Sequence, residues 1–439
     1  MKYKVGMISL GCPKNQVDGE AMLLKLKNAG FEIVNAVEDS DVMIINTCGF
    51  IEAAKTEAIE AILEVAEYKA AGLISTIVVT GCLAERYQDE IKKEIPEVDA
   101  VIGIGADGDI VKVCQKALLG FETAFFPDKG CLSIDDERLL STPPHWAYLK
   151  IAEGCDNRCA YCAIPGIRGR FRSRTVESIV AEAKQLATQG VKEVILIAQD
   201  TTRYGEDLYG RYSLDVLLKE LVKIDGIRWI RLFYCYPQRI TDSLIDVIAT
   251  EEKVCNYIDI PLQHADGDVL RAMNRVGNGE DYRQLIEKMR QRIPGLALRT
   301  TLMVGFPGET DGQFETLCRF VKDVRFDKMG CFAFSPEEDT PAYDMPHQID
   351  DEVKNHRQEL LMELQYGITE ASNRSRVGNI YEVVIDEYDG EKYIGRSYLD
   401  APEIDSGILF TADKPLQVGS FVKVKVTGFD GYDLIGILA

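Results

Sequence analysis

Three cysteines and a tyrosine fall within eight consecutive residues: Cys155, Cys159, Tyr161 and Cys162. Three thiolates can hold three irons of a 4Fe-4S cluster and leave the fourth iron free to bind another molecule. A structural zinc site usually has four protein ligands, and the nearby His145 precedes an expected strand rather than closing this loop. The spacing therefore favours an iron-sulfur cluster, with a zinc site or a chance group of buried cysteines as the alternatives.

Three further cysteines, Cys12, Cys48 and Cys82, each follow a short apolar run. The carboxyl ends of parallel strands meet at one edge of an open α/β sheet, where ligands bind, so these residues should meet there. A lone cysteine after a strand is usually a small buried hydrophobe. From the pattern alone, a second cluster and coincidence are equally open. The expected strands are 4–10, 41–46 and 76–80.

Helical patterns from about Asp18 and over 52–69 separate these strands, so we expect an α/β unit with a parallel sheet over residues 1–124. Periodicity fades over 125–146, where Pro143 and Pro144 stiffen the chain, and we expect a linker there.

Residues 147–372 alternate strand and helix patterns, which predicts a parallel, partial TIM-type barrel with its site at the carboxyl ends of the strands. Residues 373–439 change to short strands and turns, typical of a small all-β, OB-like barrel. The expected barrel strands are 148–152, 193–198, 229–234, 257–262, 298–304 and 328–334, and the expected C-terminal strands are 381–385, 392–396, 408–411, 421–427 and 433–438.

The charge balance limits the partners. The chain has 71 Asp and Glu against 50 Lys and Arg, a formal charge of -21, which opposes attraction to phosphate and favours a basic protein partner. Residues 373–439 hold 11 acidic and 7 basic side chains. We expect no export signal and no membrane span, and 12 cysteines in such a chain indicate metal or catalytic sulfur in the reducing cytoplasm.

The span 155–162 (CDNRCAYC) resembles the radical S-adenosylmethionine (SAM) superfamily. The resemblance implies that the open iron binds SAM and that Tyr161 lies near its adenine. Gln199 and Asp200, at a strand end, are candidates to hold the amino acid part of SAM; Asp200 could cap a helix, in place of that role or together with it. The span 303–310 (MVGFPGET) resembles a strand end that contacts SAM in this superfamily, which makes Gly305 a candidate to lie against SAM.

The spans 9–18 (SLGCPKNQVD), 46–50 (NTCGF) and 80–82 (TGC) resemble the methylthiotransferases, and this resemblance covers essentially the whole chain. It implies that Cys12, Cys48 and Cys82 bind an auxiliary 4Fe-4S cluster involved in sulfur delivery, and that the C-terminal barrel is a TRAM domain.

The transfer-RNA branches of this family usually have Cys-Gln-Met-Asn where this chain has residues 12–15 (CPKN). That difference, with 197–205 (IAQDTTRYG), 259–265 (DIPLQHA) and 397–405 (SYLDAPEID), resembles the branch that modifies an aspartate of the twelfth small-subunit ribosomal protein. The implied reaction is radical attachment of a methylthio group to the β-carbon, giving 3-methylthioaspartate, with a low-potential electron donor. The alternatives are modification of an adenosine in transfer RNA and a non-catalytic iron-sulfur protein that binds ribosomes.

The remaining candidates carry less weight. His264 either faces the site or is a structural histidine. Acidic residues of the C-terminal barrel, Asp400, Glu403 and Asp405, are expected to meet the basic partner or else to hold a turn, and removal of the barrel is expected to leave SAM cleavage largely intact. Six cysteines without cluster spacing are expected to pack in cores: Cys114, Cys131, Cys235, Cys255, Cys318 and Cys331.

Overall fold

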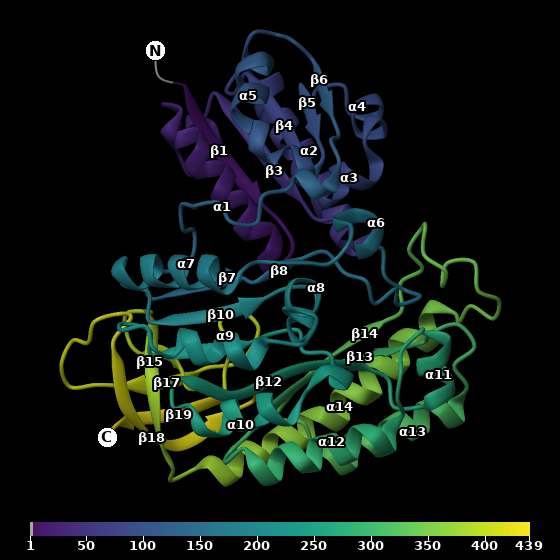
Figure 1. Cartoon of the computed structure of the whole chain (residues 1–439), viewed down its shortest axis with the longest axis vertical. Coiled ribbons are helices and arrows are strands. Elements are labelled where there is room, and N and C mark those ends of the chain that lie inside the picture. Colours follow the sequence, from purple (N-terminus) through teal and green to yellow (C-terminus); the bar gives the residue numbers. More distant parts are fainter. Residues whose placement is uncertain (1–2) are drawn as a thin grey trace.

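The strands expected from apolar runs assemble into three units in the computed structural model, which describes residues 3–439 apart from the side chain of Asp89. Figure 1 places the N-terminal unit at the top, an open parallel barrel below it, and the C-terminal β-barrel at the lower left against the open barrel. The expected mixed α/β fold is confirmed.

The N-terminal unit is a six-stranded parallel sheet in the order β2-β1-β3-β4-β5-β6, with helices on both faces. Every residue of β3 and β4 is buried, as expected for central parallel strands. The elements are β1 (Lys4–Ser9), α1 (Pro13–Asn28), β2 (Glu32–Ile33), η1 (Val37–Asp39), β3 (Val42–Thr47), α2 (Glu52–Ala70), β4 (Thr76–Gly81), α3 (Cys82–Tyr87), α4 (Asp89–Glu94), β5 (Ala100–Ile102), η2 (Ile104–Asp109), α5 (Ile110–Leu118) and β6 (Thr123–Phe125).

Helix α1 begins five residues earlier than expected, with Pro13 at its first position and Cys12 as its N-cap. Proline suits that position because its missing N–H would have no partner inside the helix. Polar residues Lys14, Asn15 and Asp18 on this helix are buried, so the hydrophobic pattern from which helices are predicted is absent from its first turns.

The middle unit is a six-stranded parallel sheet in the order β7-β10-β11-β12-β13-β14, whose edge strands do not pair, so the barrel is open as expected. It is preceded by η3 (Lys129–Cys131). The elements are β7 (Trp146–Lys150), β8 (Ala152–Glu153), α6 (Ile164–Arg168), β9 (Arg172–Ser173), α7 (Val176–Thr188), β10 (Glu193–Ile197), η4 (Thr201–Arg203), α8 (Glu206–Tyr209), α9 (Leu214–Leu221), β11 (Trp229–Leu232), η5 (Pro237–Arg239), α10 (Asp242–Thr250), β12 (Val254–Gln263), α11 (Gly267–Ala272), α12 (Gly279–Arg292), β13 (Ala297–Val304), α13 (Asp311–Val324), β14 (Lys328–Ala333) and α14 (Asp351–Arg376).

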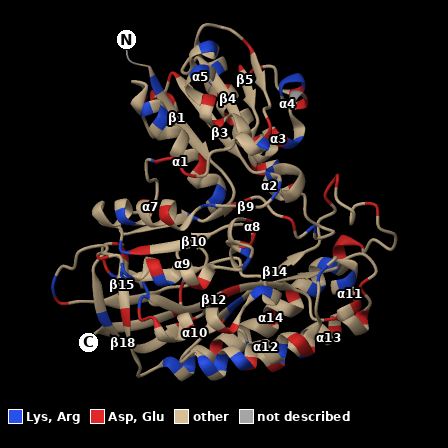
Figure 2. Cartoon of the chain, viewed as in Figure 1, with Lys and Arg blue, Asp and Glu red and all other residues tan. Residues whose placement is uncertain are grey.

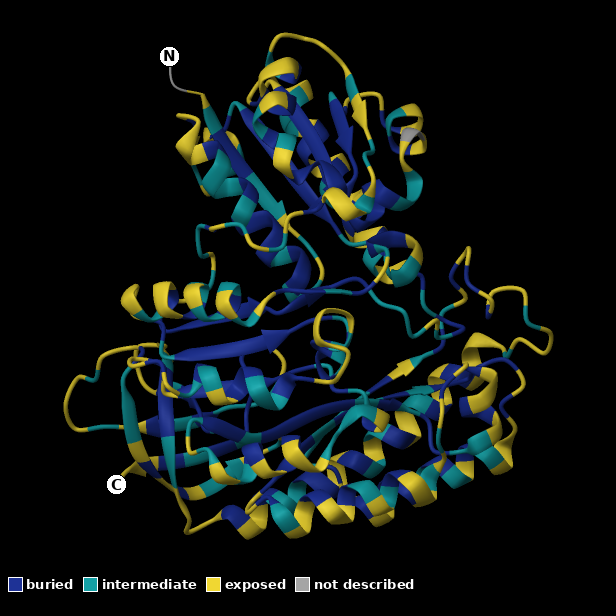
Figure 3. Cartoon of the chain, in the orientation of Figure 1, coloured by how far each residue is buried: buried dark blue, intermediate teal, exposed yellow. Residues whose placement is uncertain are grey.

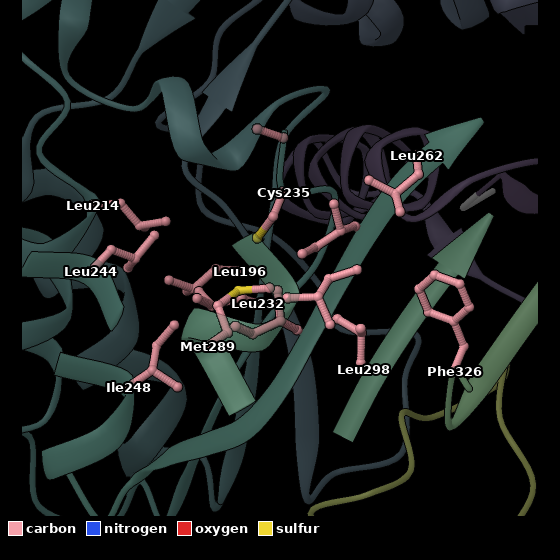
Figure 4. Packing of buried hydrophobic residues seen from close by; sticks show 14 of the residues in the cluster. Leu196, Leu214, Leu232, Cys235, Leu244, Ile248, Leu262, Met289, Leu298 and Phe326 are labelled. Carbon is pink, nitrogen blue, oxygen red and sulfur yellow. The ribbon is translucent and has the colours of Figure 1, made fainter. Parts of the chain in front are cut away.

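Successive residues of each barrel strand alternate between two environments. One set packs under the surrounding helices in the large core of Figure 4, in which Leu196, Leu232 and Leu298 come from three strands. The other set faces the concave inner side, where Tyr148 and Tyr257 pack in a second cluster. Figure 3 shows these strands as buried, whereas the outer helices expose one face.

The C-terminal unit is a closed barrel in the order β15-β16-β17-β19-β18, as expected. Its strands are β15 (Ile380–Tyr388), β16 (Tyr393–Arg396), β17 (Ile408–Thr411), β18 (Phe421–Asp430) and β19 (Asp433–Leu438). Residues from this unit, among them Leu399 and Ala401, enter the inner cluster of the open barrel. The segment 397–405 therefore packs against part of the concave inner face of the open barrel.

Of the two alternatives for Asp400, Glu403 and Asp405, the structure supports the one in which they hold the local structure together, since the Ala401 N–H donates to Asp405 at 2.9 Å. The expectation that all three are available to a basic partner is wrong. Asp400 is buried and pairs with Lys328 of β14 at 2.8 Å. Asp405 accepts a hydrogen bond from the Tyr257 hydroxyl at 2.8 Å. Glu403 is exposed but accepts one from the Tyr148 hydroxyl at 2.8 Å.

These three carboxylates bind the open barrel because the segment that carries them lies against its inner face. Removal of the C-terminal unit would uncover that apolar face, so the expectation that the rest of the chain tolerates this deletion loses its basis. None of the helices within residues 3–439 has the length and apolar character needed to cross a bilayer.

Candidate active site

All six cysteines of the two predicted groups line one cavity of about 620 Å³ between the N-terminal unit and the carboxyl ends of the barrel strands. Ile404 of the C-terminal unit also lines it, so all three units contribute. No three His, Cys, Asp or Glu side chains in the described part of the chain are arranged to hold a single metal ion. What the six cysteines share is this one cavity.

The first group lies at adjacent strand ends: Cys12 follows β1, Cys48 follows β3, and Cys82 begins α3 after β4. Glycines permit this close approach. A Cβ on Gly11, whose φ is +95°, would lie 2.7 Å from the Cβ of Cys48, and one on Gly81, with φ +93°, would lie 2.4 Å from the Thr47 carbonyl oxygen. Any side chain at either position would force the strand ends apart.

The second group lies on the loop after β8. The Cys155 N–H donates to the Gly169 carbonyl at 3.1 Å, and the Ala160 N–H donates to the Met273 carbonyl at 2.9 Å. Arg158, between the cysteines, has a φ of 51°, a left-handed conformation that is uncommon for residues other than glycine. The loop is thus held by backbone bonds at both ends while its thiols line the cavity.

The thiols differ in how readily they ionise. Although burial opposes ionisation, the Lys14 ammonium and the Arg168 guanidinium lower the pKa of Cys12. Burial raises the pKa of Cys82 to about 12 and that of Cys155 to about 11. Thiolate ligands are negatively charged, so the nearby cations favour the form that binds metal.

A buried ion network joins the N-terminal unit to the barrel at this cavity. The Arg168 guanidinium, 1% exposed, pairs with Asp18 of α1 and with Glu153 of β8, each at 2.9 Å. Lys150 pairs with the same two carboxylates. Despite burial, Arg168 and Lys150 hold the pKa of Glu153 well below its usual range. Arg168 also lies 3.7 Å from the Cys82 sulfur.

The charged side chains that line the cavity comprise four cations, Lys14, Arg168, Arg275 and Arg299, and one carboxylate, Asp259. This is the reverse of the chain as a whole, in which 71 Asp and Glu outnumber 50 Lys and Arg; Figure 2 shows both kinds of residue distributed along the chain. The cavity is therefore suited to anionic contents.

The predicted SAM-binding residues lie in different surroundings. Tyr161 and Gln199 line the cavity. The Tyr161 hydroxyl accepts a hydrogen bond from Arg275 at 3.4 Å, and Gln199 donates one to Glu153 at 2.7 Å.

Three other candidates do not line this cavity. Asp200 caps η4 by accepting from the Arg203 N–H, which is the alternative that the sequence left open for it. Gly305 packs against Lys354. His264 is fully buried: its Nδ1 accepts a hydrogen bond from the Asp266 N–H at 3.0 Å, and its Nε2 has no hydrogen-bond partner among the described residues.

Sequence reasoning missed the charged lining, which is Lys14, Arg168, Asp259, Arg275 and Arg299. It also missed Lys150 and Glu153 of the adjoining ion network. Strand alternation could have found part of it, because Asp259 and Arg299 occupy the same inward register as the buried tyrosines below them. No periodic signal marks Lys14, Arg168 or Arg275, which lie on α1, α6 and a loop.

Among the six cysteines outside the two groups, Cys114, Cys235, Cys255 and Cys331 are buried as expected, and Cys318 is partly buried. Figure 4 shows Cys235 beside Leu196 and Leu232 in the barrel core, and it also reaches the cavity wall. Cys131 is exposed, so the expectation that it packs in a core is wrong: it lies in η3, in the irregular segment before the barrel.

Family models match each unit of the chain. Residues 4–103 match the uncharacterized protein family UPF0004, residues 149–321 match the radical SAM superfamily, and residues 377–438 match the TRAM domain.

Full-length relatives share about half of the sequence. A ribosomal protein uS12 methylthiotransferase RimO from Desulforamulus reducens is 52% identical, covering 99% of this chain and 99% of the relative. One from Clostridium botulinum is 49% identical over 100% of this chain and 98% of the relative.

Solved structures share the fold at low identity. The radical SAM methyltransferase TsrM from Kitasatospora setae, with cobalamin and a [4Fe-4S] cluster bound, has a TM-score of 0.60 at 14% identity and covers 78% of this chain and 74% of that chain. The cobalamin-dependent SAM radical enzyme OxsB has a TM-score of 0.53 at 13% identity, covering 84% of this chain and 58% of that chain.

Proposed function

The chain belongs to the RimO family of ribosomal protein uS12 methylthiotransferases, and on that basis we propose that it transfers a methylthio group to uS12. It is a radical SAM enzyme. The observation that carries the proposal is that two cysteine groups from separate units line one cavity. Sulfur transfer needs such a shared space, because the sulfur, the reacting carbon and the radical source must come together there.

In this proposal Cys155, Cys159 and Cys162 hold the 4Fe-4S cluster that binds SAM, within residues 147–372. Cys12, Cys48 and Cys82 hold the auxiliary cluster, within residues 1–124, and residues 373–439 form the TRAM unit. The donor set fits these groups, since each triad leaves one iron of a cubane open.

The charges of the lining fit the same groups. A thiolate-bound cluster and the carboxylate of SAM are anionic, and the cavity offers four cations against one carboxylate. Tyr161 and Gln199 remain the proposed contacts to SAM from the cavity wall. We retain Asp200 and Gly305 as weaker candidates, through the loops that they anchor.

The target that we propose is the β-carbon of an aspartate in uS12, giving 3-methylthioaspartate. When bound, the clusters and SAM supply the radical chemistry needed for an unactivated C–H bond, which no side chain of this cavity could ionise. The protein itself orients the reactants and shields them from water. A low-potential electron donor and a basic ribosomal protein are the partners that this chemistry and the charge of -21 favour.

The test is anaerobic reconstitution followed by iron analysis and mass analysis of uS12 and of transfer RNA. We expect about eight irons per chain and methylthio mass on uS12. Changing Cys155, Cys159 and Cys162 together to alanine should remove about half of the iron and abolish SAM cleavage.

Changing Cys12, Cys48 and Cys82 together should instead leave SAM cleavage and prevent sulfur transfer. Cys318→Ala is the matched control, because this partly buried thiol lies outside the cavity. Methylthio mass on transfer RNA and none on uS12 would replace the proposed substrate, and normal product from the Cys12, Cys48, Cys82 variant would remove the auxiliary site from the mechanism.

A further inference from the structure

Lys14 is a buried cation that has no carboxylate partner among the described residues; the ionisable groups that favour its charged form are the Tyr234 hydroxyl and the Cys12 thiol. The residue is 8% exposed and lines the cavity. The neighbouring cations differ: Arg168 pairs with Asp18 and Glu153, and Arg299 pairs with Asp259 at 2.9 Å. No described carboxylate pairs with the Lys14 ammonium. A buried charge is costly unless it is paired, so this position is suited to an anion that arrives with a ligand.

The lysine is held in place by an aromatic ring from the barrel. Its Nζ lies 3.6 Å from the centroid of the Tyr234 ring. Tyr234 follows β11 with a φ of 59°, and its N–H donates to Asp259 at 3.0 Å. Left-handed backbone at a tyrosine is strained, and such strain is concentrated at functional sites. The ring supports the ammonium without neutralising it.

The two cations of the cavity without a carboxylate partner lie beside different cysteine groups. Arg275 lies 3.8 Å from the Cys159 sulfur and 3.4 Å from the Tyr161 hydroxyl, on the side proposed to bind SAM. Lys14 lies two residues from Cys12 on α1, on the side proposed to deliver sulfur. Lys14 is therefore placed where it could meet an anion of the molecule that receives sulfur.

We propose that the Lys14 ammonium binds the side-chain carboxylate of the target aspartate and so selects an acidic residue for modification. This inference rests on the proposed function. The carboxylate is bonded to the β-carbon, so an ion pair at Lys14 fixes the reacting carbon beside the Cys12 group. Positioning of this kind is the main contribution a protein can make when the reactive species comes from a cofactor.

The test compares binding of two forms of recombinant uS12, one with the target aspartate and one with asparagine in its place. Binding to the reconstituted full-length enzyme is measured by fluorescence anisotropy without turnover. The wild-type enzyme should bind the aspartate form roughly 10- to 100-fold more tightly, the range expected for a charged hydrogen bond. Lys14→Met should abolish this preference, whereas Lys14→Arg should retain most of it.

Lys27→Met is the matched control, because Lys27 lies exposed on the same helix, away from the cavity. Circular dichroism and iron content establish that each variant folds and loads, with Lys14→Gln replacing the methionine variant if it does not fold.

An unchanged preference in Lys14→Met would overturn the inference. If Lys14→Met binds SAM more weakly but keeps its preference for the aspartate form of uS12, the inference is also overturned, because the Lys14 ammonium would then bind SAM rather than the target aspartate. If wild-type enzyme puts no methylthio group on uS12, the proposed function fails and the inference falls with it; modification of uS12 without discrimination between the two forms sinks the inference alone.

Discussion

Replacing Arg168 by methionine should lower the free energy of unfolding of the apo chain by about 3–5 kcal/mol, the usual cost of breaking a buried ion pair from one side. The guanidinium is 1% exposed and pairs with Asp18 and Glu153 at 2.9 Å each. It also donates to the Asn15 side-chain oxygen at 3.3 Å. Its loss leaves two buried carboxylates with Lys150 as their shared cation.

The effect should be strongest at the junction between the units, because Asp18 and Asn15 belong to α1 whereas Glu153 belongs to the barrel. For a folding unit of roughly 150–250 residues, this loss of unfolding free energy corresponds to a fall in melting temperature of roughly 6–20 °C. The side chain of methionine fills much of the same volume, so the change reports mainly on charge and hydrogen bonds rather than on a cavity.

The assay is urea unfolding of the cluster-free chain, followed by circular dichroism and by tryptophan fluorescence. Both tryptophans, Trp146 and Trp229, lie on the inner face of the barrel, so fluorescence reports on that unit. Arg170→Met is the control, because its side chain is 81% exposed and its pair with Asp156 lies at the surface, where such pairs contribute about 1 kcal/mol or less. A loss in Arg168→Met no larger than in this control would refute the reasoning.

Three other outcomes are expected. Burial raises the pKa of Asp107, a residue of η2, well above its ordinary value, so the contribution of Asp107 to stability falls as pH rises above about 4; Asp107→Asn should therefore gain stability relative to wild type as pH rises above that value, read from melting temperatures at constant ionic strength. Asp400→Asn should lower the free energy of unfolding by roughly 3 kcal/mol in urea unfolding, because it removes the buried carboxylate that pairs with the partly buried Lys328; a neutral effect would restore the surface interpretation. Iodoacetamide at neutral pH should alkylate Cys12 before Cys82 in the apo chain, measured by peptide mass spectrometry, because the pKa of Cys12 is lowered and that of Cys82 raised to about 12. Equal rates of alkylation at Cys12 and Cys82 would contradict this third prediction.

Apolar runs were sufficient to predict most of the strands. The six barrel strands and the five C-terminal strands fall where they were expected, because buried parallel strands and alternating antiparallel strands both leave strong local patterns. Short edge strands such as β2 and β6, with two and three residues, left no comparable signal. The convergence of Cys12, Cys48 and Cys82 followed from parallel topology, since each ends a neighbouring strand.

The charged lining could not be predicted in the same way, because a lysine or arginine in a helical pattern usually indicates a solvated face. Lys14 and Arg168 are buried because each meets a residue of the other unit: Lys14 lies over the Tyr234 ring and Arg168 pairs with Asp18. The acidic residues of the segment 397–405 were misread for the same reason: their exposure depends on the inner face of another unit, against which they pack.

The inner face of the open barrel is closed from two directions, and this explains why no single unit contains the site. The C-terminal segment 397–405 covers one part of this face, where Leu399 and Ala401 join the apolar cluster. Helix α1 covers another part, where Asp18 pairs with Lys150 and Arg168. The cavity lies between helix α1 and the C-terminal segment, at the ends of the barrel strands, whose polar residues line it. Lys14 of α1 and Ile404 of the C-terminal segment also line it. A change in either neighbour therefore alters the space available to the substrate, so specificity for the target should depend on residues outside the barrel that carries the SAM site.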